Sequence, residues 1–202
     1  MELTHLIAFN LTLLVAIASP GPALLYALRA TLTGGASRGL ITGFGLAIMA
    51  AAWTTLALLG LEGVFALFPW AYVLLKVSGA AYLIWMAIGM WRNARAPMTQ
   101  NTDLPPARRA FVTGLMVNLA NPKAVLFASA VLLVIFPPQL QLWEKAMIVA
   151  NHLAIELLFY STFALLLSTP PARAGYLRLK PLIDRIAAAL LGTLGLRLLI
   201  ER

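Results

Sequence analysis

Long apolar runs separated by short polar stretches dominate the chain. A membrane-spanning helix needs about 20 mostly apolar residues. We expect six such spans, near residues 3–28, 39–61, 69–91, 110–136, 146–167 and 182–200. Strands of a membrane barrel would alternate apolar and polar residues over about 10 positions, whereas these runs are continuous and longer. The pattern therefore predicts an all-α polytopic membrane protein with six transmembrane helices.

Two of these runs are interrupted by residues that end a helix. The first contains Ser19-Pro20-Gly21-Pro22, and the fourth contains Asn118-Leu119-Ala120-Asn121-Pro122-Lys123. Broken backbone is tolerated at membrane depth only where protein or a water-filled cavity covers it. Pro20 and Pro122 are 102 residues apart (122 − 20), half of the 202-residue chain. Interrupted segments at corresponding positions of two halves indicate a transporter's binding site.

One polar linker divides the chain. Residues 92–109 contain three prolines together with Asn101, Thr102 and Asp103, a composition typical of a loop. The linker separates halves 1–91 and 110–202, each with three expected spans, within a single transporter domain of residues 1–202. Because three is odd, equivalent halves would have opposite orientations in the membrane, which is the inverted topology of many transporters.

Composition excludes several classes of protein. Hydrophobic residues make up 61% of the chain and charged residues only 11%, against about 25% charged residues in soluble domains. The net charge of +8 is scattered between apolar runs and forms no basic patch interleaved with aromatics, so we expect no nucleic-acid partner. The chain has no cysteine and two histidines, so we expect no disulfide, no metal site and no cofactor.

The distribution of basic residues predicts the orientation. Ten basic residues fall in the loop after the first span, in the linker and near the start of the sixth span, and three fall on the opposite side. Lys and Arg accumulate in cytoplasmic loops. We therefore expect both the N- and the C-terminus to lie outside the cytoplasm.

Lys123 is the main candidate for chemistry. It lies about 13 residues into the fourth expected span, roughly 20 Å along a helix, and a charge at the bilayer centre costs about 2.5–3.5 kcal/mol on insertion scales. It either lines a central cavity, where it meets a carboxylate, or forms a structural ion pair. We expect the helix that restarts beside it to present free amide donors and a positive dipole end to an anion. Asn118 or Asn121 could satisfy neighbouring backbone groups.

Glu156 is the acidic residue that we expect deep in a span. It could bind a substrate ammonium, carry a proton, or pair with Lys123 or Lys76. His152, four residues earlier on the same helical face, is a secondary candidate that we expect closer to the outer interface. Lys76 is another, because it lies about seven residues from a span end, where it could snorkel. We expect Asp184 outside the membrane core, so no catalytic pair is visible and the chain is not expected to be an enzyme.

Glycines predict close helix contacts. Gly39, Gly43, Gly45 and Gly79 are small residues of the kind that let helix backbones approach in membranes. Such faces permit a homodimer but do not require one.

Three motifs carry a resemblance to a known family. They are Ser-Pro-Gly-Pro-Ala at 19–23, Leu-Lys-Val-Ser-Gly-Ala-Ala-Tyr-Leu at 75–83, and Gly-Leu-Met-Val-Asn-Leu-Ala-Asn-Pro-Lys-Ala at 114–124. With these motifs the chain resembles the lysine-exporter (LysE/RhtB) family of bacterial amino-acid exporters over nearly its whole length.

The resemblance implies export of amino acids or close derivatives from the cytoplasm across a bacterial inner membrane, driven by a proton gradient or the membrane potential. Carried over by position, it assigns a substrate-binding role to Ser19, Pro20, Gly21, Pro22, Asn118, Asn121, Pro122 and Lys123, with Lys76 as a further motif residue. Glu156 belongs to no motif of the family, so its role rests on its expected burial. The alternatives are a cation or metal-ion transporter of similar layout and a non-transporting membrane scaffold.

Overall fold

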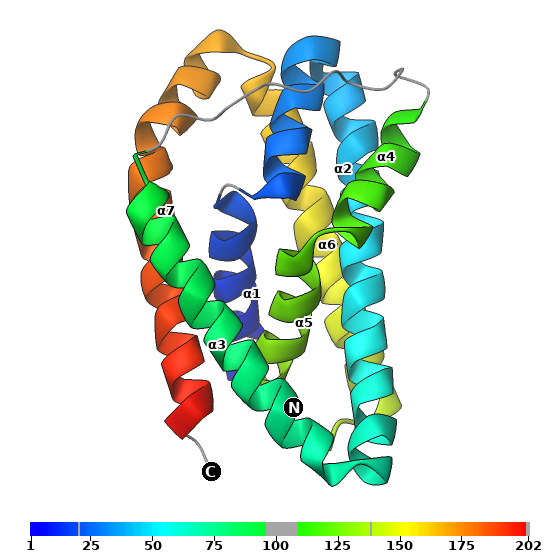
Figure 1. The fold of residues 1–202 in the computed structure, drawn as a ribbon. Coiled ribbons are helices and arrows are strands. Elements are labelled where there is room, and N and C mark those ends of the chain that lie inside the picture. The colour runs from blue at the N-terminus through cyan, green and yellow to red at the C-terminus, as the bar shows by residue number, and fades with distance from the viewer. Residues whose placement is uncertain (20, 96–108, 138, 201–202) are drawn as a thin grey trace.

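The computed structural model describes residues 1–19, 21–95, 109–137 and 139–200. Within these residues the chain is helical and contains no strand, in agreement with the predicted all-α class. The helices are α1 (Leu3–Ala18), α2 (Pro22–Leu67), α3 (Pro69–Asn93), α4 (Ala110–Leu119), α5 (Pro122–Ile135), α6 (Leu142–Leu167) and α7 (Pro170–Ile200). Both termini lie at one end of the molecule (Figure 1).

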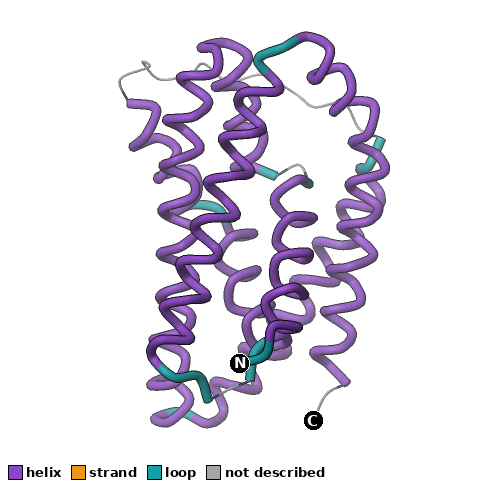
Figure 2. Tube along the Cα trace, turned by 180° about the vertical axis from the view of Figure 1, so that it is seen from behind, coloured by secondary structure: helices purple, strands orange, loops and turns teal. Residues whose placement is uncertain are grey.

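Both predicted helix breaks are present. α1 ends before Ser19 and α2 begins at Pro22, while α4 ends at Leu119 and α5 begins at Pro122. The axes of α4 and α5 differ by 66°. Figure 2 shows the two interruptions as short loops at a similar height inside the helical bundle.

The expected loop between the first two spans is helical instead. α2 continues to Gly35, where φ of 72° lies outside the helical region, and the chain turns back there before the helix resumes. Glycine adopts this left-handed conformation without the steric cost of a Cβ. The second predicted span is therefore the second arm of α2.

The sixth predicted span also begins earlier than expected. α7 starts at Pro170 and runs through Pro181, so the basic stretch before residue 182 is helix rather than loop. Of the predicted linker 92–109, residues 96–108 lie outside the described residues, and α3 extends into its start as far as Asn93. By length and hydropathy, residues 22–60 and α6 can each cross a membrane, and the bent α4–α5 pair can form a third crossing.

The helices approach each other closely at the predicted glycines. A Cβ on Gly45 or Gly114 would overlap backbone of the other helix where α2 crosses α4, and one on Gly43 would lie 2.6 Å from Cβ of Tyr160 on α6. Gly39 likewise abuts Ala164 of α6. The prediction of close packing is thus confirmed for three of its four glycines, and the surroundings of Gly79 lie outside the described part.

The helices form two groups. α2 packs extensively on α4 and α6, whereas α3 and α7 pack chiefly on each other. The short helices α1 and α5 lie between these groups (Figure 1). Protein covers the two breaks in part: Ser19, Asn118 and Asn121 are buried, whereas Pro22, Leu119 and Ala120 are exposed.

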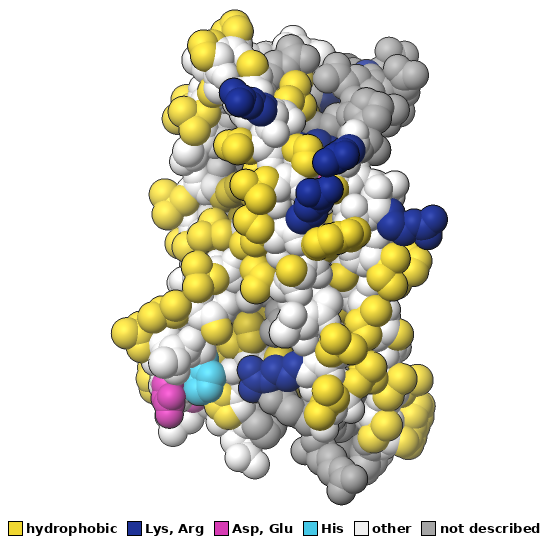
Figure 3. All heavy atoms as spheres, turned by 90° about the vertical axis from the view of Figure 1, so that its left-hand side faces the viewer, with side chains coloured by type: hydrophobic (Ala, Val, Ile, Leu, Met, Phe, Trp, Pro, Cys, Tyr) yellow, Lys and Arg dark blue, Asp and Glu magenta, His cyan; other side chains and the backbone are white. Residues whose placement is uncertain are grey.

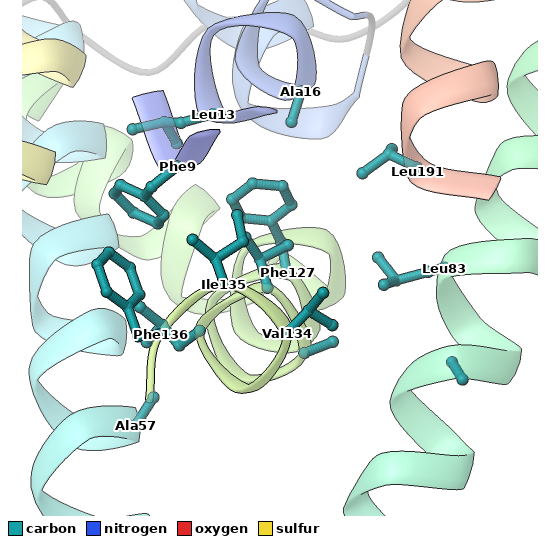
Figure 4. Close-up of a cluster of buried hydrophobic side chains, with 14 of the residues drawn as sticks. Phe9, Leu13, Ala16, Ala57, Leu83, Phe127, Val134, Ile135, Phe136 and Leu191 are labelled. Atoms are coloured by element: carbon teal, nitrogen blue, oxygen red, sulfur yellow. The ribbon is translucent and has the colours of Figure 1, made fainter. Parts of the chain in front are cut away.

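Two apolar clusters lie on either side of the breaks. The terminus-side cluster includes Phe9, Leu13, Phe127, Val131, Phe136, Leu83 and Leu191. Figure 4 shows several of its side chains converging from α1, α3, α5 and α7. The turn-side cluster, towards Gly35, includes Leu24, Leu28, Tyr160, Phe163 and Leu167, with Tyr176 packed against it.

Large apolar side chains also cover the outside of the molecule. Trp85 on α3, Leu158 on α6 and Leu196 on α7 are all more than half exposed. Apolar surface spread over outward helix faces is what a lipid-exposed bundle presents.

Candidate functional site

Lys123 joins the two helix breaks. Its backbone belongs to the first turn of α5, and its Nζ donates to the carbonyl oxygens of Ala16 at 2.8 Å and Ser19 at 3.1 Å. Ala16 lies in the last turn of α1 and Ser19 is the residue that caps it, where helix carbonyls lack their usual partner four residues on. A cation there also interacts favourably with the helix dipole. The lysine therefore holds the end of one broken segment to the start of the other.

Gly21 makes room for this lysine. A Cβ at position 21 would lie 3.3 Å from Cδ of Lys123 and 3.5 Å from Nζ. A larger side chain would push the ammonium away from the α1 carbonyls. Gly21 in the first break therefore provides the space that the side chain of Lys123, in the second break, occupies.

The asparagines of the second break bind backbone groups. Asn121 caps α5 by accepting from the backbone N–H of Lys123 at 3.1 Å, and its carbonyl oxygen accepts from Ala124 and Val125. Asn118 donates to the carbonyl oxygen of Leu46 on α2 at 2.6 Å. The expectation that α5 presents free amide donors is therefore wrong for these three residues, because Asn121 occupies them.

Glu156 lies on the α6 face that points at the break. It is 4% exposed, and its Oε1 lies 3.3 Å from Nε2 of His152. Nδ1 of His152 lies 2.6 Å from Oγ1 of Thr54 on α2. The second carboxylate oxygen, Oε2, is buried without a hydrogen-bond partner among the described residues. Buried polar atoms are normally paired, so this oxygen is available to a ligand.

The placement of His152 differs from expectation. It is 3% exposed rather than interfacial, because the ring of Phe9 packs edge-on against it at 5.5 Å and Thr54 and Glu156 satisfy both nitrogens. His152, Glu156 and Tyr160 follow one another at four-residue intervals and therefore line one face of α6. Sequence analysis did not single out Thr54 or Tyr160.

These groups surround a small cavity of about 50 Å³. A cavity of this size holds a few water molecules at most and is too small for an amino acid. Its polar lining comes from both breaks and from α6: Ser19, Asn118, Asn121, Lys123, His152, Glu156 and Tyr160. Gly21 and apolar residues, including Leu13, Leu24 and Phe127, complete the wall.

The structure thus brings together seven of the predicted residues: Ser19, Gly21, Asn118, Asn121, Lys123, His152 and Glu156. Pro22 begins α2 and is exposed, away from the cavity lining. Pro20 lies outside the described residues, as do the side chains of Pro122 and Lys76.

The expected position of Asp184 is wrong. Asp184 is 3% exposed, accepts from Oγ of Ser19 at 3.1 Å and pairs with Nζ of Lys180 at 3.0 Å. Together with Glu156, it acts electrostatically on Lys123. The apolar pattern places Asp184 at the edge of the sixth expected span, whereas α7 begins at Pro170, 14 residues before Asp184, and buries it. Its spacing of four residues from Lys180 was the signal that could have identified a paired internal charge.

In the described part of the chain, no metal site accompanies these charges. Among the described residues, no group of three or more His, Asp or Glu side chains is placed to hold a metal ion. The arrangement instead offers a cation, Lys123, and a carboxylate, Glu156, in the lining of one cavity.

Comparison with known proteins agrees with the motifs. A family model described as LysE type translocator matches residues 14–202. The threonine efflux protein of Escherichia coli (strain K12) is 31% identical over 195 residues, 94% of each chain. The homoserine/homoserine lactone efflux protein of Salmonella typhi is 33% identical over 130 residues, 63% of this chain and 60% of that protein.

A further relative is a membrane protein of Escherichia coli (strain K12) named YahN, 26% identical over 217 residues. No solved structure gives a significant match to the chain. Because the family model covers nearly the whole sequence, the chain belongs to the LysE type translocator family.

Proposed function

We propose that the protein is a secondary exporter of amino acids or close derivatives across the inner membrane of a bacterium. The family supports a translocator, and two relatives are named for the efflux of threonine and of homoserine or its lactone. The observation that carries the proposal is the small cavity lined by Lys123 and Glu156, at the junction of both broken segments.

The chemistry of the cavity suits a zwitterion. Nζ of Lys123 uses two of its three donors on α1 carbonyls, which leaves one for a substrate carboxylate. Oε2 of Glu156, which has no partner among the described residues, accepts from the substrate ammonium. Hydrogen bonds between charged groups are the stronger class and fix orientation in a dry site.

Transport requires the cavity to widen. A cavity of about 50 Å³ is far below the roughly 300–1,000 Å³ of ordinary ligand pockets. Both the terminus-side and the turn-side cluster contribute to its lining, with Leu13 and Phe127 from the first and Leu24 and Tyr160 from the second. Opening one cluster at a time would give alternating access, with the site fixed near the two breaks.

We propose six crossing segments in two inverted halves. α1, α2 and α3 would correspond to α4–α5, α6 and α7, with the arm of α2 before Gly35 matching α5. Two contacts support this scheme: α3 packs on α7, and α2 packs on α6, so proposed equivalents lie against each other. The interrupted segments meet at Lys123, as such a pseudo-twofold arrangement requires.

The charge distribution supports the orientation. In the face shown in Figure 3, Lys and Arg side chains gather mainly in the half that holds the Gly35 turn, while acidic side chains lie at the opposite end. With the basic end in the cytoplasm, both termini are outside.

The energy for export would come from the proton gradient or the membrane potential. The hydrogen-bonded chain Thr54–His152–Glu156 offers a proton-accepting group beside the cavity.

Everted membrane vesicles test the proposal. Wild-type vesicles should accumulate labelled threonine or homoserine when a proton gradient or membrane potential is imposed. Lys123→Ala should abolish this accumulation at an unchanged membrane level, whereas Arg109→Ala, at an exposed cation on the same half of the chain, should retain it. Wild-type vesicles that transport no amino acid in a panel of neutral, basic and sulfur-containing substrates would refute the exporter and favour a scaffold.

A further inference from the structure

A stripe of polar residues runs along one face of α7. Tyr176, Lys180 and Asp184 are spaced by four residues and therefore lie one above another on the helix. Lys180 is 7% exposed and Asp184 is 3% exposed. Charged residues inside a membrane bundle are expensive unless they are paired. We call these three residues the α7 latch.

The α7 latch binds two other elements. Oδ1 of Asp184 accepts from Oγ of Ser19 at 3.1 Å, and the hydroxyl of Tyr176 donates to the carbonyl oxygen of Ala18 at 3.4 Å. Both partners belong to the end of α1 at the first break. Lys180 donates to Asp184 and to the carbonyl oxygen of Ala94 at 3.0 Å, where α3 ends. The stripe thus connects the α3–α7 pair to the broken segment.

A second hollow lies on the turn side of this connection. It has a volume of about 420 Å³. Its walls come from the Gly35 turn and the α6–α7 junction: Thr31, Leu32, Gly35, Leu167, Ser168, Pro170, Ala174 and Leu177. Phe163 and Tyr176 meet edge to face at 5.6 Å within the turn-side cluster. That cluster also supplies Leu24 and Tyr160 to the wall of the central cavity. The cluster therefore separates the hollow from Lys123, and Tyr176 belongs both to it and to the α7 latch.

We infer that the α7 latch is the cytoplasmic gate of the exporter, and that α7 must release Ser19 and Ala18 before substrate can pass from this hollow to Lys123. This inference rests on the transport function proposed above. Because α3 and α7 pack chiefly on each other, they can tilt as one unit, as packed helices do in domain closure. The Lys180–Asp184 pair lies within α7 and moves with it, so these two charges stay paired with each other. The hydrogen bonds that must break include those of Asp184 to Ser19 and of Tyr176 to Ala18.

The natural absence of cysteine allows a direct test by single-cysteine labelling. Ala50 lines the central cavity from α2 and is 2% exposed, so Ala50→Cys reports access to it, and Ala124→Cys is a second reporter on α5. Everted vesicles present the cytoplasmic face to a small maleimide. Ser19→Ala and Tyr176→Phe each remove one contact to the break and leave the charge pair intact.

The loss of one such hydrogen bond should accelerate labelling from the cytoplasmic face about twofold to tenfold and slow net export. Two matched controls make the same chemical changes elsewhere. Ser129→Ala removes a hydroxyl that bonds within its own helix, and Tyr26→Phe alters a half-buried tyrosine on α2. Both should label at the wild-type rate. Asp184→Asn should have the largest effect, because it also leaves the ammonium of Lys180 without a counter-charge.

Three results would overturn the inference. If the rate in Ser19→Ala and Tyr176→Phe vesicles equals that of the controls while export by the wild type is intact, the α7 latch is not a gate and only this inference fails. If labelling rises only in right-side-out vesicles, the gate faces the other side. If wild-type vesicles export no amino acid at all, the proposed function itself fails, and the gate with it.

Discussion

Replacing Glu156 by glutamine should raise stability and weaken substrate binding at the same time. The amide keeps the shape of the carboxylate and can still accept from His152 Nε2, but it carries no charge. In the wild type Oε2 is buried without a partner among the described residues, and an unsatisfied buried group costs about 1–3 kcal/mol, more when charged. A neutral amide lowers that cost, so the melting temperature of purified Glu156→Gln should equal or exceed that of the wild type.

The affinity should change in the opposite direction. A hydrogen bond to a charged group contributes about 1.5–3 kcal/mol, which corresponds to roughly a 10- to 150-fold weaker Kd for an amino acid whose ammonium meets Glu156. Exchange of labelled substrate in proteoliposomes without an ion gradient gives this affinity without involving energy coupling. Its half-saturating concentration should rise by that factor.

Three outcomes would refute this reasoning. A Glu156→Gln protein that exchanges substrate with wild-type affinity does not use this carboxylate for the ammonium. Normal exchange together with lost gradient-driven export would assign Glu156 to proton transfer instead. A strongly lowered melting temperature would show that the carboxylate is a structural partner of His152, in which case its burial carries no information about substrate.

Three further predictions concern the framework of the site. Gly45→Ala should destabilise the protein by about 1–3 kcal/mol because the new Cβ overlaps the Phe111 carbonyl, whereas Gly60→Ala, which meets nothing within 4 Å, should melt like the wild type; equal melting of the two variants would contradict the α2–α4 contact. Asn121→Ala removes the cap of α5 and should cost about 1 kcal/mol in thermal unfolding; an unchanged melting temperature would count against the cap. Thr54→Val leaves Nδ1 of His152 without its partner and should cost about 1–3 kcal/mol, while Thr55→Val, whose hydroxyl bonds its own helix, should cost less; the reverse order would refute the Thr54–His152 bond.

The two helix breaks and the glycine contacts of α2 could be predicted from the sequence. Proline and asparagine inside apolar runs have few structural solutions at membrane depth, so the two breaks and their meeting at Lys123 could be anticipated. The small residues at the α2 crossings could be anticipated for the same reason, because only glycine permits that approach.

Other features depend on contacts that a single sequence does not encode. Asn118 and Asn121 were expected near the site, but which backbone groups they satisfy follows from the positions of α2 and α5. His152 is buried because Phe9 of α1 covers it, a contact across more than 140 residues. Asp184 and Lys180 looked like the polar end of a span, yet α7 buries both because Ser19 and the end of α3 satisfy them.

The most direct test of the central claim is a structure of the protein with an amino acid bound. The account predicts that the substrate carboxylate lies within hydrogen-bond distance of Nζ of Lys123, that its ammonium faces Glu156, and that the cavity between the two breaks is enlarged. An amino acid seated elsewhere, with Lys123 still bound only to the carbonyls of Ala16 and Ser19, would show that this lysine holds broken helices together and does not bind substrate.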